Sequence, residues 1–121
     1  MRKILLVEDE PSLREVYKVI LSREPYELHI ATDGQEALEK CKHYTYDLIL
    51  LDLMMPVLDG LGFLEKYFKR SKRPAKIIVL SNLSAGEELT KALNMGAYKN
   101  ILKSDLSPRQ LLATVRYELE V

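Results

Sequence analysis

The stretch LILLDLMMP, residues 48–56, decides the fold of this chain. Its first part, Leu48–Leu51, is continuously apolar, which is typical of a strand buried on both faces of a sheet. Similar runs occur at Ile4–Val7 and Ile77–Leu80. Strands of this kind belong to parallel sheets whose faces are both covered by helices, so these runs predict an α/β domain.

The segments between the apolar runs carry helix signals. Apolar residues at helical spacing predict one buried stripe, formed by Leu13, Val16, Tyr17, Ile20 and Leu21. Asp33, Ser84 and Ser107 each precede a Glu or Gln by three positions, which predicts capped helix starts. Gly96 suits the left-handed residue that ends a helix over about 85–95.

Two weaker strand candidates, Glu27–Ala31 and Ala97–Leu102, complete a pattern in which strand and helix alternate five times. This pattern predicts a doubly wound sheet of parallel strands joined by right-handed crossovers. The expected strand order is 2-1-3-4-5, the flavodoxin-like arrangement. In that order ligands bind beyond the carboxyl ends of the strands, where the first and third strands are neighbours.

The composition predicts one globular domain. The chain has 121 residues, and its 18 basic residues balance 18 acidic ones, which disfavours nucleic acid and membrane surfaces as partners. The lone Cys41 and two histidines exclude an internal disulfide and a Cys/His zinc site. No apolar run approaches the roughly 18 residues of a membrane span, so we expect a cytoplasmic protein.

Polar residues follow the predicted strands where each strand ends. Glu8 and Asp9 follow the first strand, Asp52 the third, Ser81 the fourth and Lys103 the fifth. Because the carboxyl ends of parallel strands meet at one edge of the sheet, we expect these side chains to converge.

Some of these residues also have a purely structural interpretation. Asp9 or Glu10 suits a helix start, Ser81 suits a turn, and Lys103 suits a strand end with its ammonium group in water. Asp52 is different because apolar residues flank it, and an isolated buried charge costs several kcal/mol. A divalent cation would relieve that cost, and ligands that are all oxygen atoms favour Mg²⁺.

A carboxylate beside Mg²⁺, with a lysine and a hydroxyl as further donors, is suited to a phosphoryl group. Asp52 is then the candidate nucleophile, because carboxylates form acyl phosphates. In this order along the chain, the residues resemble the receiver domain of two-component response regulators, the family of the chemotaxis regulator. The matching motifs are Leu6–Pro11, Asp52–Pro56 with Asp59 and Gly60, Ser81, and Gly96–Ala97 leading to Lys103.

The resemblance implies that Asp52 accepts a phosphoryl group from a sensor histidine kinase or a phosphotransfer protein. It implies Mg²⁺ as cofactor, held by Glu8 (mostly through water), Asp9, Asp52 and the backbone carbonyl of Met54. Ser81 and Lys103 would each contact a phosphoryl oxygen. Because the resemblance spans residues 1–121, we expect one receiver domain and no output domain.

Three positions depart from the family pattern. Asn100 stands where an aromatic residue usually swings inward on activation, Ser104 where a cis proline is usual, and Asn82 where a small residue is usual. Ser81, Tyr98 and Asn100 are therefore the candidate switch residues. Tyr98 either replaces the usual aromatic or is a surface residue, and we expect any activation change to centre on Ser81–Gly86 and the next helix.

The resemblance implies a signalling module that catalyses only its own phosphorylation and dephosphorylation. Its output would be a downstream protein partner or a missing output domain, with a phosphorylation-linked homodimer as a further possibility. The enzyme alternative is a phosphatase or phosphotransferase of the haloacid dehalogenase type, which needs an acid two residues after its nucleophile; Met54 stands there. A flavin-binding protein is disfavoured by the acids and lysine at the site.

A basic run without an intervening acid includes Lys66, Lys69, Arg70, Lys72, Arg73 and Lys76. It is interpreted first as the solvated end of a helix, with contact to nucleic acid or an acidic partner as the alternative.

Overall fold

The computed structural model of the chain describes residues 1–22, 25–82 and 86–120. The strands are β1 (Arg2–Val7), β2 (Tyr26–Ala31), β3 (Leu48–Asp52), β4 (Lys76–Ser81) and β5 (Lys99–Leu102). The helices are α1 (Pro11–Leu21), α2 (Gly34–His43), α3 (Gly60–Arg70), α4 (Gly86–Met95) and α5 (Pro108–Leu119), with a 3₁₀ turn, η1 (Lys103–Asp105), after β5. The predicted helix cap at Ser84 lies outside the described residues.

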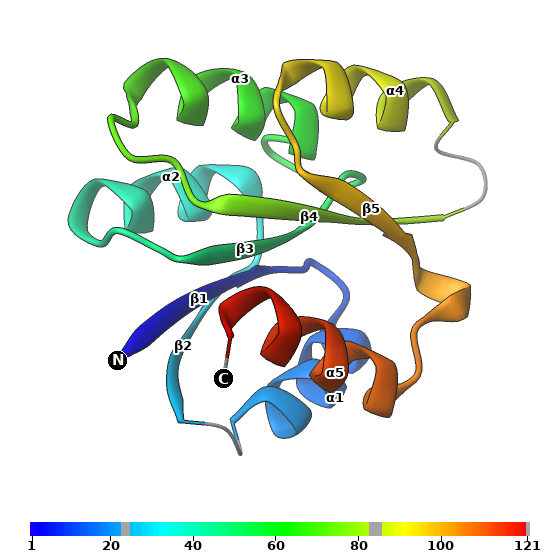
Figure 1. Cartoon of the computed structure of the whole chain (residues 1–121). Coiled ribbons are helices and arrows are strands. Elements are labelled where there is room, and N and C mark those ends of the chain that lie inside the picture. The colour runs from blue at the N-terminus through cyan, green and yellow to red at the C-terminus, as the bar shows by residue number, and fades with distance from the viewer. Residues whose placement is uncertain (23–24, 83–85, 121) are drawn as a thin grey trace.

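The five strands form one parallel sheet in the order β2-β1-β3-β4-β5. Helices α2, α3 and α4 cover one face, and α1 and α5 cover the other (Figure 1). The predicted fold class and strand order are therefore confirmed. None of the helices in the described part of the chain is long and apolar enough to span a membrane.

The continuous apolar runs arise because each central strand serves two cores. In β1, Leu5 and Val7 pack into the core under α2, α3 and α4, whereas Ile4 and Leu6 pack into the core under α1 and α5. Successive side chains of a strand point to opposite faces, so both sets must be apolar. In the central strands, polar residues are therefore expected only at the strand ends.

The predicted stripe on α1 is wrong at one residue. Tyr17 and Leu21 are buried, but Val16 is 48% exposed. Helix α1 packs beside α5 on one face of the sheet. The stripe of residues that it buries there is narrower than the stripe that the apolar residues predict. Val16 lies outside that surface.

The fifth strand begins two residues later than predicted, at Lys99 instead of Ala97. The amide of Ala97 donates to the carbonyl of Ala92, 3.1 Å away, and therefore closes α4 instead of joining the sheet. Gly96 has a φ of +126°, a left-handed conformation that favours glycine, as predicted. Side-chain caps at Asp33 and Ser107 are also as predicted.

Candidate functional site

Three carboxylates meet beyond the carboxyl ends of β1 and β3. Glu8 follows β1 and is fully buried, Asp52 ends β3 with 4% exposure, and Asp9 is half-buried. One oxygen from each of the three residues lies within 4.8 Å of the others. The strands deliver these side chains to one place because β1 and β3 are neighbours in the sheet.

Lys103 brings the positive charge. Its Nζ lies 3.0 Å from Glu8 Oε1 and 3.2 Å from Asp52 Oδ2, and its side chain is 14% exposed. It is the first residue of η1, directly after β5. One ammonium group thus contacts two buried carboxylates.

The site holds more negative charge than Lys103 balances. Burial raises the pKa of Asp52, and the neighbouring Glu8 raises it further, while Lys103 opposes both effects. Burial and contact with Asp52 likewise raise the pKa of Asp9. Burial lowers the pKa of Lys103, but its bonds to Glu8 and Asp52 outweigh this and leave that pKa raised. A divalent cation fits this cluster electrostatically.

Met54 and Ser81 complete the rim. The amide of Met54 donates to Asp52 Oδ1 at 3.2 Å, while the side chain of Met54 points largely into solvent. Ser81 ends β4 beside Leu102 of β5 and is 2% exposed. Within the part of the chain that the structure describes, its Oγ has no hydrogen-bond partner. A buried hydroxyl in this state is ready to donate to an incoming oxygen.

The sequence reasoning missed Arg14. From α1, its guanidinium donates to the backbone carbonyls of Glu8 and Asp9, at 3.3 and 3.2 Å. The amide of Glu10 also donates to Glu8 Oε2 at 3.3 Å. These bonds fix the loop that carries two of the three acids. No motif marked Arg14, because a basic residue on a helix is usually a surface residue.

The other two switch candidates, Tyr98 and Asn100, differ in their surroundings. Tyr98 precedes β5 and is 54% exposed, with Lys76 Nζ at 4.6 Å from its ring centroid. The amide of Tyr98 donates to the carbonyl of Ile77 in β4 at 2.8 Å, although β5 itself begins one residue later, at Lys99. Asn100 is half-buried opposite Val79. Residues 83–85 of the expected Ser81–Gly86 region lie outside the described residues.

The fold is a doubly wound domain, and its cluster of three carboxylates lies at the strand ends. Comparison with known proteins shows the family to which this fold belongs. A family model described as the response regulator receiver domain matches residues 4–116. The chain therefore belongs to the response regulator receiver domain family.

Two curated relatives are transcriptional regulators. One is the probable transcriptional regulator ycf27 of Porphyridium aerugineum, 40% identical over 114 residues, and another is the transcriptional regulatory protein SrrA of Staphylococcus aureus, 38% identical over 116 residues. Each match covers 94% of this chain but 46% of the relative. The chain thus spans about half the length of these relatives.

Solved structures of similar proteins share the whole fold. The chemotaxis response regulator CheY4 of Vibrio cholerae is 30% identical, with a TM-score of 0.86 and 98% of both chains covered. A CheY-like receiver domain protein of Methanospirillum hungatei is 32% identical, with a TM-score of 0.88, and the match covers 99% of this chain and 94% of that one.

Proposed function

We propose that this chain is a phosphorylation-controlled switch in which Asp52 accepts a phosphoryl group from a sensor histidine kinase or a phosphotransfer protein. The observation that carries the proposal is the contact of Lys103 with both Glu8 and Asp52, in a cluster of three carboxylates at the strand ends. That arrangement provides a nucleophile, a countercharge and a set of oxygen ligands together.

Mg²⁺ is the cofactor that the donor set favours. Asp9 and Asp52 would hold it through carboxylate oxygens, Met54 through its backbone carbonyl and Glu8 mostly through water. All donors are oxygen atoms, and the raised pKa values of Asp9 and Asp52 reflect a charge that a hard cation relieves. When bound, it would offset the charge of the carboxylates and of the phosphoryl oxygens.

The transfer uses the geometry of Asp52. A carboxylate oxygen attacks phosphorus, the bond from phosphorus to the donor histidine nitrogen breaks, and that nitrogen keeps the electron pair. The Met54 amide holds Asp52 Oδ1 in place during the attack. Lys103 and the Ser81 hydroxyl are positioned at the rim to contact two phosphoryl oxygens. Water later hydrolyses the acyl phosphate and restores the carboxylate.

The output would be an altered protein-binding surface. The relatives named above are transcriptional regulators about twice as long as this chain, so a downstream partner or a further domain would receive the signal. Phosphorylation-linked homodimers are a second route. The change would begin at Ser81 and reach α4, which follows β4 in the chain. No turnover of an external substrate is proposed, because Met54 offers no acid at the position a phosphatase needs.

The central test is phosphorylation of Asp52. The protein is incubated with acetyl phosphate or beryllofluoride, with and without Mg²⁺, and followed by intact mass and by NMR. We expect modification only with Mg²⁺ and none in Asp52→Asn. Asp105→Asn is the matched control, because Asp105 is exposed in η1. Equal modification of Asp52→Asn and the parent protein would contradict the assignment.

A further inference from the structure

A groove of basic character lies between the C-terminal ends of α2 and α3. It consists of two adjoining cavities of about 270 and 230 Å³. Both are lined by Cys41, Tyr67, Arg70 and Ser71, so they form one continuous depression, which we call the α2–α3 groove.

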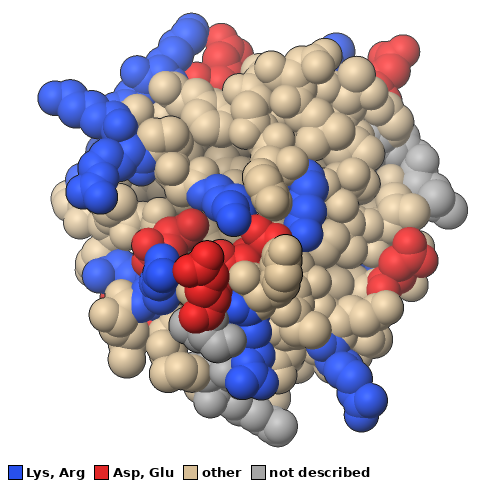
Figure 2. Space-filling view, in the orientation of Figure 1, with Lys and Arg blue, Asp and Glu red and all other residues tan. Residues whose placement is uncertain are grey.

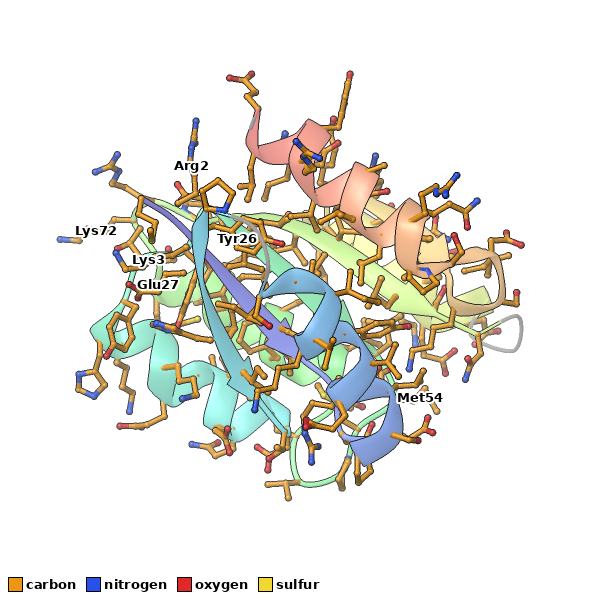
Figure 3. The ribbon with its side chains drawn as sticks, turned by 90° about the horizontal axis from the view of Figure 1, so that it is seen from below. Arg2, Lys3, Tyr26, Glu27, Met54 and Lys72 are labelled. Atoms are coloured by element: carbon orange, nitrogen blue, oxygen red, sulfur yellow. The ribbon has the colours of Figure 1, made fainter. Side chains whose placement is uncertain are left out.

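The α2–α3 groove is remote from Asp52. Its loop residues Thr45 and Lys72 precede β3 and β4, whereas Asp52 and Ser81 end these strands. A five-residue strand with a rise of about 3.3 Å per residue separates the two ends by roughly 16 Å. Figure 3 shows Lys72 and Met54 at opposite ends of the molecule. The α2–α3 groove is therefore separate from the phosphorylation site.

Positive charge is concentrated at the α2–α3 groove. Lys42, Arg70, Lys72 and Arg73 line it, and no acidic residue does. In the described ranges Lys42 pairs with Glu39 at 3.2 Å, whereas no ion pair is found for the other three cations. Figure 2 shows Lys and Arg gathered over this end of α3, at the upper left. Because the whole chain carries 18 charges of each sign, this is a local separation of charge.

Neutralisation of helix ends does not account for this charge. Each helix C-terminus carries only about half a negative charge, and two helices end here, α2 and α3. Four cations line the α2–α3 groove, and Lys72 and Arg73 follow Ser71, the residue that caps α3. A net positive field remains for a ligand.

The floor of the α2–α3 groove is apolar and firmly held. Leu38 and Tyr67 are buried there, and the ring of Tyr67 stacks on Phe63 with 5.3 Å between centroids. The hydroxyl of Tyr67 accepts the amide of Ala75 at 2.7 Å. Burial raises the pKa of the Cys41 thiol to about 12, so it adds no negative charge at neutral pH.

We propose that the α2–α3 groove binds a small organic phosphate of about the size of a mononucleotide. The guanidinium groups of Arg70 and Arg73 match phosphate oxygens in geometry and charge. The floor of Leu38 and Tyr67 accepts a flat or apolar group attached to that phosphate. The combined space falls in the range of about 300 to 1,000 Å³ that is usual for small-molecule sites.

An NMR titration with adenosine monophosphate tests this proposal. EDTA is present, so that no metal bound at Asp52 attracts the probe. We expect saturable amide shifts confined to residues 38–45 and 67–75. The double variant Arg70→Glu, Arg73→Glu should weaken binding by about tenfold or more. The matched control is Lys91→Glu, Arg109→Glu, which makes the same change of net charge at exposed positions of α4 and α5 and should leave binding within about twofold.

Three outcomes would overturn the proposal. Equal weakening in the two double variants would show general attraction to a charged surface. Inorganic phosphate that binds as tightly as adenosine monophosphate would remove the role of the apolar floor. Saturable binding of a polyglutamate peptide at the same amides, with no response to the nucleotide, would assign the α2–α3 groove to an acidic protein segment.

Discussion

Lys103 holds its ammonium group between two buried carboxylates, at 3.0 Å from Glu8 and 3.2 Å from Asp52. Because cations repel each other, Lys103 opposes Mg²⁺ in the same cluster. Lys103→Met should therefore bind Mg²⁺ about tenfold more tightly, yet respond less to beryllofluoride because a contact to the phosphoryl mimic is lost. Calorimetric titration with Mg²⁺ and NMR shifts with beryllofluoride measure the two effects.

A loss of folding would weaken both Mg²⁺ binding and the beryllofluoride response. A role of Lys103 in the site should instead change the two in opposite directions. Lys103→Arg keeps the charge and should keep the Mg²⁺ affinity of the parent within about threefold. An unchanged beryllofluoride response in Lys103→Met would remove Lys103 from the proposed phosphoryl contact.

Arg14 acts on the site through backbone bonds to Glu8 and Asp9. Arg14→Gln should loosen the loop that carries these acids and weaken Mg²⁺ binding by about three- to tenfold, since misplaced ligands bind metal less well. Removing a nearby positive charge alone would strengthen Mg²⁺ binding, so the sign of the change is decisive. Lys18→Gln, an exposed change on the same helix, is the control for a change of charge on α1.

The sequence was informative where a residue lies next to an apolar run. Asp52 and Lys103 could be predicted as site residues because Asp52 ends β3 and Lys103 comes directly after β5. The structure brings both together with Glu8. Arg14 could not be found in this way, because its partners are backbone carbonyls and its own position on α1 has no distinctive neighbours. Contacts between a side chain and distant backbone depend on loop geometry, which residue type does not specify.

At the scale of elements, two ion pairs to one buried glutamate tie α5 to the sheet. Glu118 of α5 has a side chain with 1% exposure, and it lies 2.9 Å from Lys76 of β4 and 3.2 Å from Lys99 of β5. Burial raises the pKa of Glu118, but the bonds from both lysines outweigh it and leave that pKa lowered. The two ion pairs therefore stabilise the fold above the pKa of about 4.3 of an unfolded glutamate, and this contribution is lost as pH falls through the folded pKa of Glu118.

Glu118→Gln should lower the free energy of unfolding by about 1 kcal/mol at pH 7, because two partly exposed lysines lose their charged partner. The difference from the parent should shrink as the pH falls below about 4. Urea unfolding at several pH values measures both. The control is Glu65→Gln, which removes an exposed pair with Lys69 at 3.4 Å and should cost less than about 0.5 kcal/mol. A pH-independent loss in Glu118→Gln would point to packing instead of charge.

Element boundaries were less predictable than the elements themselves. The weak strand candidate near Ala97 was correct in kind, but the hydrogen bond from Ala97 to Ala92 moved its start to Lys99. Ala97 is a small apolar residue, so its type cannot indicate whether it extends the strand or closes the preceding helix. Caps at Asp33 and Ser107 were predictable because the capping bond is local.

At the scale of the whole molecule, binding at the strand ends is coupled to global stability. Mg²⁺ that binds the folded chain and not the unfolded one should add about 2.7 kcal/mol at a concentration of 100 Kd. Asp9→Asn should abolish most of this gain, because it removes one of the three clustered carboxylates. Thermal unfolding with and without Mg²⁺ tests it. A gain of the same size in Asp9→Asn would place the ion elsewhere.

Strand β3 contributes side chains to both cores, and this has a consequence for how the chain tolerates insertions. Hydrophobic alternation normally fixes the register of a strand, but β3 is apolar toward both cores, with Ile49 and Leu51 on one side and Leu48 and Leu50 on the other. A slip of one position would exchange these sets, but it would also move Asp47 or Asp52, the acids on either side of the apolar run, into a core position. The same slip would carry Asp52 away from Glu8 and Lys103. The frame of the central strand is thus marked by an acid at each end of its apolar run. A shift of frame should both remove the site and destabilise the fold, because an isolated charge buried in a core costs several kcal/mol.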